Sequence, residues 1–292
     1  MDILIGILEQ GLLYGLLAIG IYITYIILNF PDLTVDSSFP LGAAVTVKLI
    51  SMGINPWLSL IPAFLAGVVA GLVTGIIHVK FKIKDLLSGI ITMTGLYTIN
   101  LTIAGQANLP IFQQSTIFNT ESNSLLPEAI TPFSVILIAL PIVLLCKYAL
   151  DIYLKTKSGL LLRAVGDNQN IATILAVDSD KVKVLGLAIA NGLVALSGAI
   201  VGQQQRFFEI SMGTGTMVMG LASVIIGLKV FDRIKRLAPT TKALFGSVLY
   251  KGVVALAIAL GLSAQSMKLL TAVILFIVLI ASRDEENKVA YA

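Results

Sequence analysis

The chain has 292 residues, of which 57% are hydrophobic and only 12% are charged, and its mean hydropathy is +0.95. Soluble domains carry about 25% charged residues, so this composition excludes a soluble globular protein and indicates a polytopic membrane protein. The net charge of +4 does not indicate nucleic-acid binding, because the basic residues lie at the ends of apolar runs. One cysteine and one histidine, Cys146 and His78, argue against a disulfide and against a Cys/His metal site.

The pattern predicts an all-α membrane protein of about nine transmembrane segments, some short or discontinuous. The expected segments are 3–28, 41–52, 57–77, 86–104, 133–150, 184–201, 212–228, 243–262 and 269–281, followed by a charged tail. Residues 41–52 are too few to cross a bilayer alone, at about 1.5 Å per residue. The run 212–228 is also short and is rich in glycine.

The positive charges predict the orientation. They cluster in the turn 80–84, the segment 158–183, the loop 229–242 and the tail. Because cytoplasmic loops carry an excess of Lys and Arg, we expect these four regions inside, an outside N-terminus and an inside C-terminus. The polar loop 105–131, which contains Glu121 and Glu128 but no Lys or Arg, is then extracellular.

The two ends of the chain show a weak internal symmetry. In each half the second segment is short and follows a polar break, DLTVDSSF in the first and RFFEISMGTG in the second. Matching interrupted segments in oppositely oriented halves are typical of an inverted repeat with a transport path at its interface. We therefore expect one transmembrane domain, 1–292. Its parts are a first half (1–105), an extracellular loop (106–130), a connecting span (131–157), a cytoplasmic segment (158–183) and a second half with the tail (184–292).

The cytoplasmic segment 158–183 is the longest polar interruption. Ile171, Ile174 and Leu175 recur at helical spacing, and Asp167 or Asn168 is a candidate cap for the start of that helix. A short amphipathic helix between spans indicates a cytoplasmic partner such as a motor ATPase. An ordinary connecting loop is the alternative.

The break before the second segment holds two carboxylates, Asp32 and Asp36, beside Ser37 and Ser38. We expect them to cap the half-helix that follows, since a carboxylate at membrane depth needs water or a partner. Direct contact with a transported solute is the alternative reading.

The span 86–104 carries further polar side chains at Thr94, Tyr97 and Asn100. Tyr97 and Asn100 are three residues apart, so they lie on related faces and could line a polar path. Hydrogen bonding between helices would explain them equally well. Thr214 and Thr216, at the start of the second short segment, are also candidate pathway residues.

Three other groups have simpler roles. Gly67, Gly71 and Gly75, spaced by four, and the run 42–44 are expected to let helices approach closely. Lys48 and Lys251 should snorkel or find a partner, and Lys251 is read as an assembly contact. The stretch 203–209, with Arg206 and Glu209, is expected to be an outer polar turn; with Glu121 and Glu128 it could instead seat an extracellular binding protein.

Several motifs are absent from the sequence. It contains no G-x-x-x-x-G-K-[ST] phosphate loop, no H-E-x-x-H and no G-x-S-x-G. No span carries the series of acidic groups expected of a proton pump. We therefore expect no catalysis in this chain, and any energy to come from another subunit.

The sequence resembles the permease subunits of ABC importers of the branched-chain amino acid, ribose and nucleoside type. The match is closest to a subgroup of uncharacterised permeases associated with tryptophan and tyrosine uptake in bacteria. The resemblance covers most of the chain. It is carried by NFPDLTVDSSFPLGAAV (29–45), GINPWL (53–58), residues 70–110, SGLLLRAVGDNQNIA (158–172) and MGTGTMVMGLASVIIG (212–227). After Ile226 and Gly227, where branched-chain permeases have a Gly-Gly-x-Gly-Ser run, this chain reads LKVFDRIKR, so the branched-chain substrate is not carried over.

The resemblance implies a bacterial cell-membrane permease that works as a homodimer with a cytoplasmic ABC ATPase dimer and an extracellular substrate-binding lipoprotein. It implies no cofactor in this chain, with ATP and Mg in the partner ATPase. It also implies that 163–177 forms the coupling helix that enters a groove on the ATPase. The residues expected there are Arg163, Ala164, Val165, Gly166, Asp167, Asn168, Ile171 and Ile174.

Together these observations predict an importer permease that moves a small polar solute, with an aromatic amino acid favoured, by alternating access. Two alternatives remain open as transporters: an ABC importer for nucleosides or sugars, and a secondary transporter without an ATPase. A structural membrane protein that moves no solute is a third.

Overall fold

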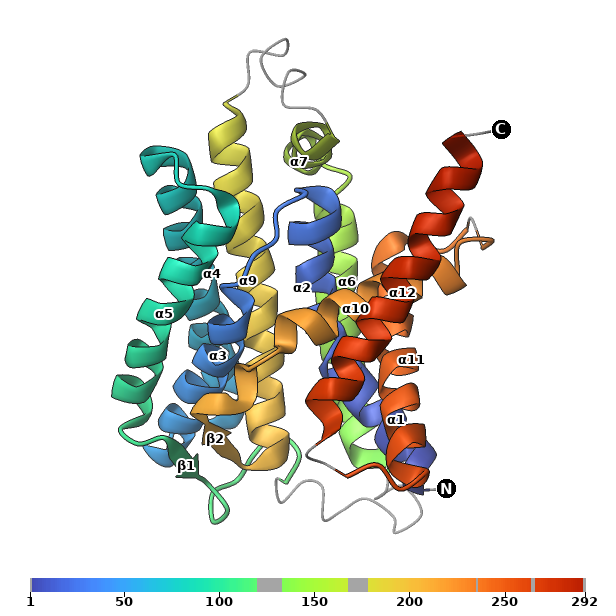
Figure 1. The fold of residues 1–292 in the computed structure, drawn as a ribbon. Coiled ribbons are helices and arrows are strands. Elements are labelled where there is room, and N and C mark those ends of the chain that lie inside the picture. Colours follow the sequence, from blue (N-terminus) through green and yellow to red (C-terminus); the bar gives the residue numbers. More distant parts are fainter. Residues whose placement is uncertain (1, 120–132, 168–177, 235, 264–265, 291–292) are drawn as a thin grey trace.

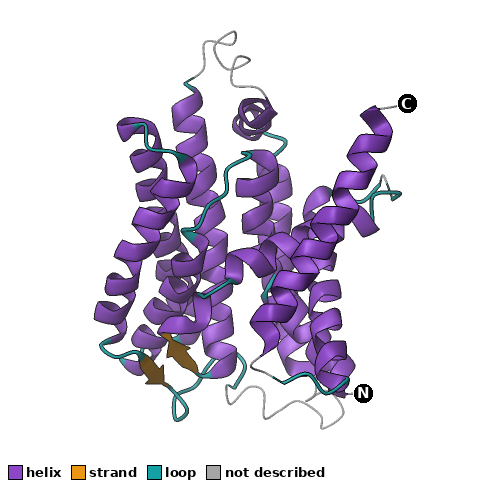
Figure 2. Ribbon diagram, in the orientation of Figure 1, coloured by secondary structure: helices purple, strands orange, loops and turns teal. Residues whose placement is uncertain are grey.

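The computed structural model describes residues 2–119, 133–167, 178–234, 236–263 and 266–290. The described chain is almost entirely helical (Figure 2). The first span runs through α1 (Asp2–Leu13), α2 (Gly15–Ile21) and a π-helical turn, η1 (Tyr22–Ile27). The helices that follow are α3 (Val35–Ser51), α4 (Pro56–Phe81), α5 (Asp85–Ala104), α6 (Ser134–Tyr153), α7 (Lys157–Asp167), α9 (Ser179–Gln205), α10 (Thr216–Val230), α11 (Pro239–Ala259) and α12 (Met267–Ala290).

Seven helical stretches in the described residues are long and apolar enough to cross a membrane, which confirms a polytopic membrane protein. They correspond to seven of the nine expected segments. The short run 212–228 is one of them, because the 3₁₀ turn η4 (Ile210–Gly213) extends it to 21 residues, Ile210–Val230. The expected segment 269–281 falls in α12, whose apolar part is Met267–Ile280, and 41–52 falls in α3.

Helix α9 forms the centre of the molecule. Most residues of its apolar stretch are buried, and the helix packs closely against both α3 and α4. Glycines make these contacts: a Cβ at Gly67 or Gly71 of α4 would lie 2.3 or 2.2 Å from a backbone oxygen of α9, and one at Gly42 of α3 would lie 1.8 Å from another. The predicted packing role of these glycines is confirmed.

Two helices begin at mid-depth. After η1 the chain turns back in an extended stretch, and α3 runs from the middle of the molecule towards the end that holds the strands (Figure 1). In the second half the chain enters from the strand end through η4, and α10 runs from the middle towards the opposite end (Figure 1). The two half-helices therefore start near the same point and run in opposite directions.

The stretch 105–119 and the predicted polar turn 203–209 are more ordered than expected. Strands β1 (Asn108–Pro110) and β2 (Phe207–Glu209) pair antiparallel, with Leu109 opposite Phe208. Helix α9 continues through Gln205 before the strand begins. Gln203 is fully buried and donates to the backbone oxygen of Pro56, so its reading as part of a solvated turn is wrong.

The basic segments gather at one end of the molecule. The turn between α4 and α5, helix α7 and the C-terminal end of α12 lie at one end, whereas the N-terminus and both strands lie at the other (Figure 1). This is the distribution that the positive-charge pattern predicts.

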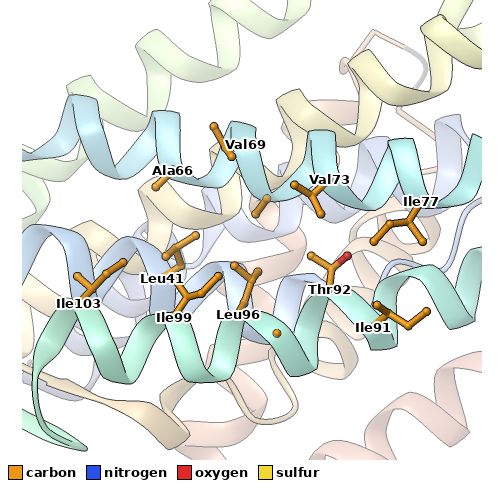
Figure 3. A pocket seen from close by; sticks show the side chains of 12 residues that line it. Leu41, Ala66, Val69, Val73, Ile77, Ile91, Thr92, Leu96, Ile99 and Ile103 are labelled. Carbon is orange, nitrogen blue, oxygen red and sulfur yellow. The ribbon is translucent and has the colours of Figure 1, made fainter. Parts of the chain in front are cut away.

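An apolar groove of about 400 Å³ runs between α4 and α5 over Leu41 of α3 (Figure 3). Thr92 is the one polar side chain among its lining residues, and its hydroxyl donates to the Ser88 carbonyl of its own helix. The groove suits lipid chains or apolar protein surface rather than a polar solute.

Candidate functional site

Asp36 joins the two half-helices. Its carboxylate accepts hydrogen bonds from the backbone N–H groups of Gly215 (3.1 Å) and Met217 (2.8 Å) and from the Thr216 hydroxyl (3.0 Å), all at the start of α10. Asp36 itself is in the first turn of α3. Asp36 was expected to cap the helix that contains it; that expectation is wrong, because it caps α10 instead.

Two glycines allow this contact. Gly215, the N-cap of α10, has φ +83°, a left-handed conformation that favours glycine. A Cβ on Gly213 would lie 1.9 Å from the backbone oxygen of Asp36, so the chain entering α10 passes directly over the first turn of α3. The glycine-rich MGTGT stretch thus allows the backbone of one half to reach the carboxylate of the other.

Asp32 holds the start of α3 to α9. Its Oδ1 accepts from the backbone N–H of Thr34 (2.9 Å), which agrees with the predicted capping role. Its Oδ2 accepts from the amide of Asn191 (2.7 Å), and the Oδ1 of Asn191 accepts from the Ser38 hydroxyl (2.7 Å). All four side chains are buried. Asn191 was missed, although an amide in the middle of an apolar span is a recognisable signal.

The same turn of α3 is tied to α4 and α5. The Thr34 and Thr74 hydroxyls are 2.8 Å apart. The Ser37 hydroxyl donates to the Met93 carbonyl (2.8 Å), and the amide of Asn100 donates to the Ser37 carbonyl (3.0 Å). The Oδ1 of Asn100 is buried and has no hydrogen-bond partner in the described part of the chain. The first turn of α3 therefore contacts α4, α5, α9 and α10 through polar groups.

Thr94 and Tyr97 lie apart from this junction. Both are exposed on α5, and the Thr94 hydroxyl donates to the Ile90 carbonyl of its own helix. Thr98 and Thr102 are exposed on the same helix. The structure does not bring Asn100 to this surface, because Asn100 is fully buried against α3.

Two of the predicted docking residues lie at the strand end. Arg206 terminates α9 in a left-handed conformation (φ +60°), and Glu209 in β2 accepts from the Ser211 hydroxyl. Glu121 and Glu128 lie outside the described residues. Lys251, read from sequence as an assembly contact, has its ammonium 3.6 Å from the centre of the Tyr14 ring.

Helix α7 contains the first part of the predicted coupling segment. Leu162 and Val165 are buried, whereas Arg163 and Asp167 are exposed, so α7 is amphipathic. Asp167 is the last residue of α7, and the helix that it was predicted to cap lies outside the described residues. Ala164 is half-buried in α7. Asn168, Ile171 and Ile174 lie outside the described residues.

Gly166 makes the tightest contact of α7. A Cβ at this position would lie 1.6 Å from the backbone oxygen of Ile27, the last residue of the π-helical turn η1. π-Helical turns occur often at functional sites. The chain leaves η1 for the extended stretch that ends at α3, so α7 rests directly on the segment that leads to the half-helix junction.

Asp178 caps α9 immediately after the predicted coupling segment. Its carboxylate accepts from the backbone N–H groups of Asp180 and Lys181 and pairs with the Lys181 ammonium at 3.2 Å. The hydrogen bond from the Lys181 side chain lowers the pKa of Asp178. In the described residues, no group of three or more His, Cys, Asp or Glu side chains could hold a metal ion.

Comparisons with known proteins agree with this architecture. Residues 3–282 match the family described as branched-chain amino acid transport system / permease component. The chain is 41% identical to a tyrosine transport system permease protein of Clostridioides difficile, over 93% of this chain and 88% of that protein. It is 32% identical to an uncharacterised protein of Rickettsia prowazekii, over 98% and 100%. A probable branched-chain amino acid permease of Methanocaldococcus jannaschii is 30% identical, over 76% and 74%.

The family match covers nearly the whole chain, and the relatives are matched along most of their own length. A permease component moves a solute and does not convert it chemically. The chain therefore belongs to the family of branched-chain amino acid transport permeases, and it is the multi-pass membrane permease component of an ABC-type importer.

Proposed function

We propose that this chain is the permease of a binding-protein-dependent ABC importer that moves an aromatic amino acid into the cell. The observation that carries the proposal is the meeting of α3 and α10 at mid-depth, joined by Asp36. Transporters bind solutes near the bilayer midplane where discontinuous helices of inverted halves meet. The name of the relative at 41% identity, a tyrosine permease, favours an aromatic solute.

The path runs between two copies of the permease. Thr94, Tyr97, Thr98 and Thr102 are exposed on α5, and the Thr94 and Thr102 hydroxyls donate to carbonyls of their own helix. Polar groups at membrane depth face protein or a water-filled path rather than lipid. A second copy placed against α5 would enclose this face, and nine segments per copy in two inverted halves would form its walls.

Separate ATPase subunits, with their ATP and Mg, supply the energy. The coupling segment begins in α7, where Arg163 and Asp167 are exposed for the ATPase groove. Movement of α7 reaches the junction through the contact between Gly166 and Ile27. At the opposite end, Arg206 and Glu209, with Glu121 and Glu128 in the loop, form the seat for the extracellular binding lipoprotein.

The proposal is tested by purification from the native membrane in mild detergent, with every partner chain identified by mass. We expect a second copy of this chain and an ATPase at equal stoichiometry, and uptake of labelled tyrosine or tryptophan into proteoliposomes that requires ATP and the binding protein. Uptake by the chain alone, without ATP, would establish a secondary transporter instead. ATP-dependent uptake of a nucleoside or ribose but of no amino acid would refute the substrate class alone.

A further inference from the structure

A cavity of about 360 Å³ lies beside the half-helix junction. It is open on one side and is lined by the start of α10, the first two turns of α12 and Tyr14, which separates α1 from α2. Its lining includes Thr216, the first residue of α10, and Thr214, which lies two residues before it. The cavity thus adjoins the groups that Asp36 holds in place.

Some polar side chains of the cavity already have hydrogen-bond partners in the protein, and others do not. The Thr216 hydroxyl donates to Asp36, and the Thr271 hydroxyl donates to the Met267 carbonyl. By contrast, neither the Thr214 hydroxyl nor the Lys268 ammonium has a hydrogen bond or ion pair within the described residues. Both residues are exposed, so the ammonium and the hydroxyl are in contact with solvent and accessible to a carboxylate.

The remaining wall is aromatic and sulfur-rich. Met212, Met219 and Met267 line the cavity together with the Tyr14 ring. Methionine side chains adapt their shape to a ligand, and their sulfur atoms make favourable contacts with aromatic rings. The Tyr14 ring is held by stacking on Phe39, with ring centres 5.5 Å apart, and by Lys251. One wall is therefore fixed before any ligand enters.

Composition distinguishes this cavity from others in the described part of the chain. Small-molecule sites have volumes of about 300–1,000 Å³, so 360 Å³ suits a single amino acid rather than a peptide. The α4–α5 groove and the cavity around Cys146 are lined almost wholly by aliphatic and aromatic side chains. In the cavity between α1 and α11, the ammonium of Lys251 already contacts Tyr14.

From this arrangement the geometry points to a solute subsite within each permease copy, which binds the zwitterion of an aromatic amino acid. Lys268 and Thr214 hold the carboxylate, and the three methionines with Tyr14 enclose the ring. The inference rests on the proposed function and adds a binding position beside α10 within each copy, apart from the path proposed at α5. The Thr216 hydroxyl bonds to both the Asp36 carboxylate and the Gly213 carbonyl in the turn beside the cavity. A solute in the subsite would therefore lie against a residue that helps to hold the half-helix junction.

The test is protection of a single cysteine from maleimide, measured on the complete permease–ATPase complex in nanodiscs. Cys146, the chain's one cysteine, is first replaced by alanine. Ala272→Cys then places a thiol in the cavity wall, and Ala255→Cys places the matched thiol in the cavity between α1 and α11. We expect L-tyrosine or L-tryptophan to slow labelling at position 272 at least fivefold and to leave position 255 unchanged.

The charge is tested separately. Lys268→Met should raise the KM for tyrosine uptake about tenfold and abolish the protection, Lys268→Arg should restore both, and Lys48→Met should change neither. Unprotected labelling at 272 in a complex that imports tyrosine would overturn the subsite and leave the proposed function intact. Equal protection by L-leucine would overturn the aromatic assignment. If the complex imports no amino acid, the proposed function fails, and protection measured without ATP still decides the subsite.

Discussion

Replacing Asp36 by alanine is the sharpest test of the half-helix junction. The substitution removes the acceptor of two backbone N–H groups, those of Gly215 and Met217. The Thr216 hydroxyl keeps a second acceptor, the Gly213 carbonyl at 2.9 Å, so only the two N–H groups lose their partner. A buried donor without an acceptor costs about 1–3 kcal/mol, and these two hydrogen bonds are part-buried, so Asp36→Ala should destabilise the folded permease by about 2 kcal/mol.

Three further substitutions should destabilise the permease less than Asp36→Ala does. Asp36→Asn keeps one acceptor oxygen and should cost about half as much as alanine. Thr216→Val removes a single hydroxyl and should cost at most about 1.5 kcal/mol. Asp85→Ala is the matched control: Asp85 is also an acidic residue in a first helical turn, but its carboxylate has no hydrogen bond in the described part of the chain. It should cost no more than about 1 kcal/mol, from the helix dipole.

The assay combines two readouts on the purified complex, the apparent melting temperature and amino acid uptake. Asp36→Ala should lower the melting temperature by at least about 5 °C and abolish uptake, while its association with the ATPase persists. If Asp36→Ala melts within a degree of Asp85→Ala and still imports its solute, the carboxylate does not hold the two half-helices together and the reasoning is refuted.

Two further perturbations address the neighbouring contacts. Gly166→Ala should displace α7, because its Cβ would lie 1.6 Å from the Ile27 oxygen, and ATP hydrolysis should continue without uptake; Gly95→Ala, which meets nothing within 4 Å, is the control. Uptake at the wild-type ratio to hydrolysis in Gly166→Ala would contradict this. Asn191→Leu should lower the apparent melting temperature, since a buried carboxylate oxygen of Asp32 loses its donor at a cost of about 1–3 kcal/mol or more. Much of the loss should return in the Asp32→Leu/Asn191→Leu double variant, and equal melting of single and double variants would argue against the pairing.

Much of the architecture could be predicted from local patterns. Apolar runs long enough to span a bilayer identify seven of the helices, because length and hydropathy are properties of the run itself. The matched polar breaks predict two short segments, which correspond to the half-helices α3 and α10. The stripe of Gly67, Gly71 and Gly75 indicated a close helix contact, although the partner α9 could not be named from it.

The junction itself could not be predicted, because its partners are far apart in sequence. A carboxylate in a first helical turn is expected to cap its own helix, and nothing near Asp36 reveals that α10 begins 180 residues later at hydrogen-bond distance. The burial of Gln203 was missed for a similar reason. Its run of three glutamines looks like a solvated turn until Pro56 and Ser59 of another helix are placed against it. Strands of three residues carry too little alternation to be recognised.

The head-to-head start of α3 and α10 also has an electrostatic consequence. Each helix N-terminus carries about half a positive elementary charge, so two of them at one place amount to about one. Asp36 lies in the first turn of one half-helix and caps the other, and within the described residues it pairs with no Lys or Arg. The Asp36 carboxylate therefore lies where both helix ends favour a negative charge, and Asp32 adds a second carboxylate at the start of α3. A rearrangement that separates the two half-helices would leave the N-terminus of α10 without this carboxylate.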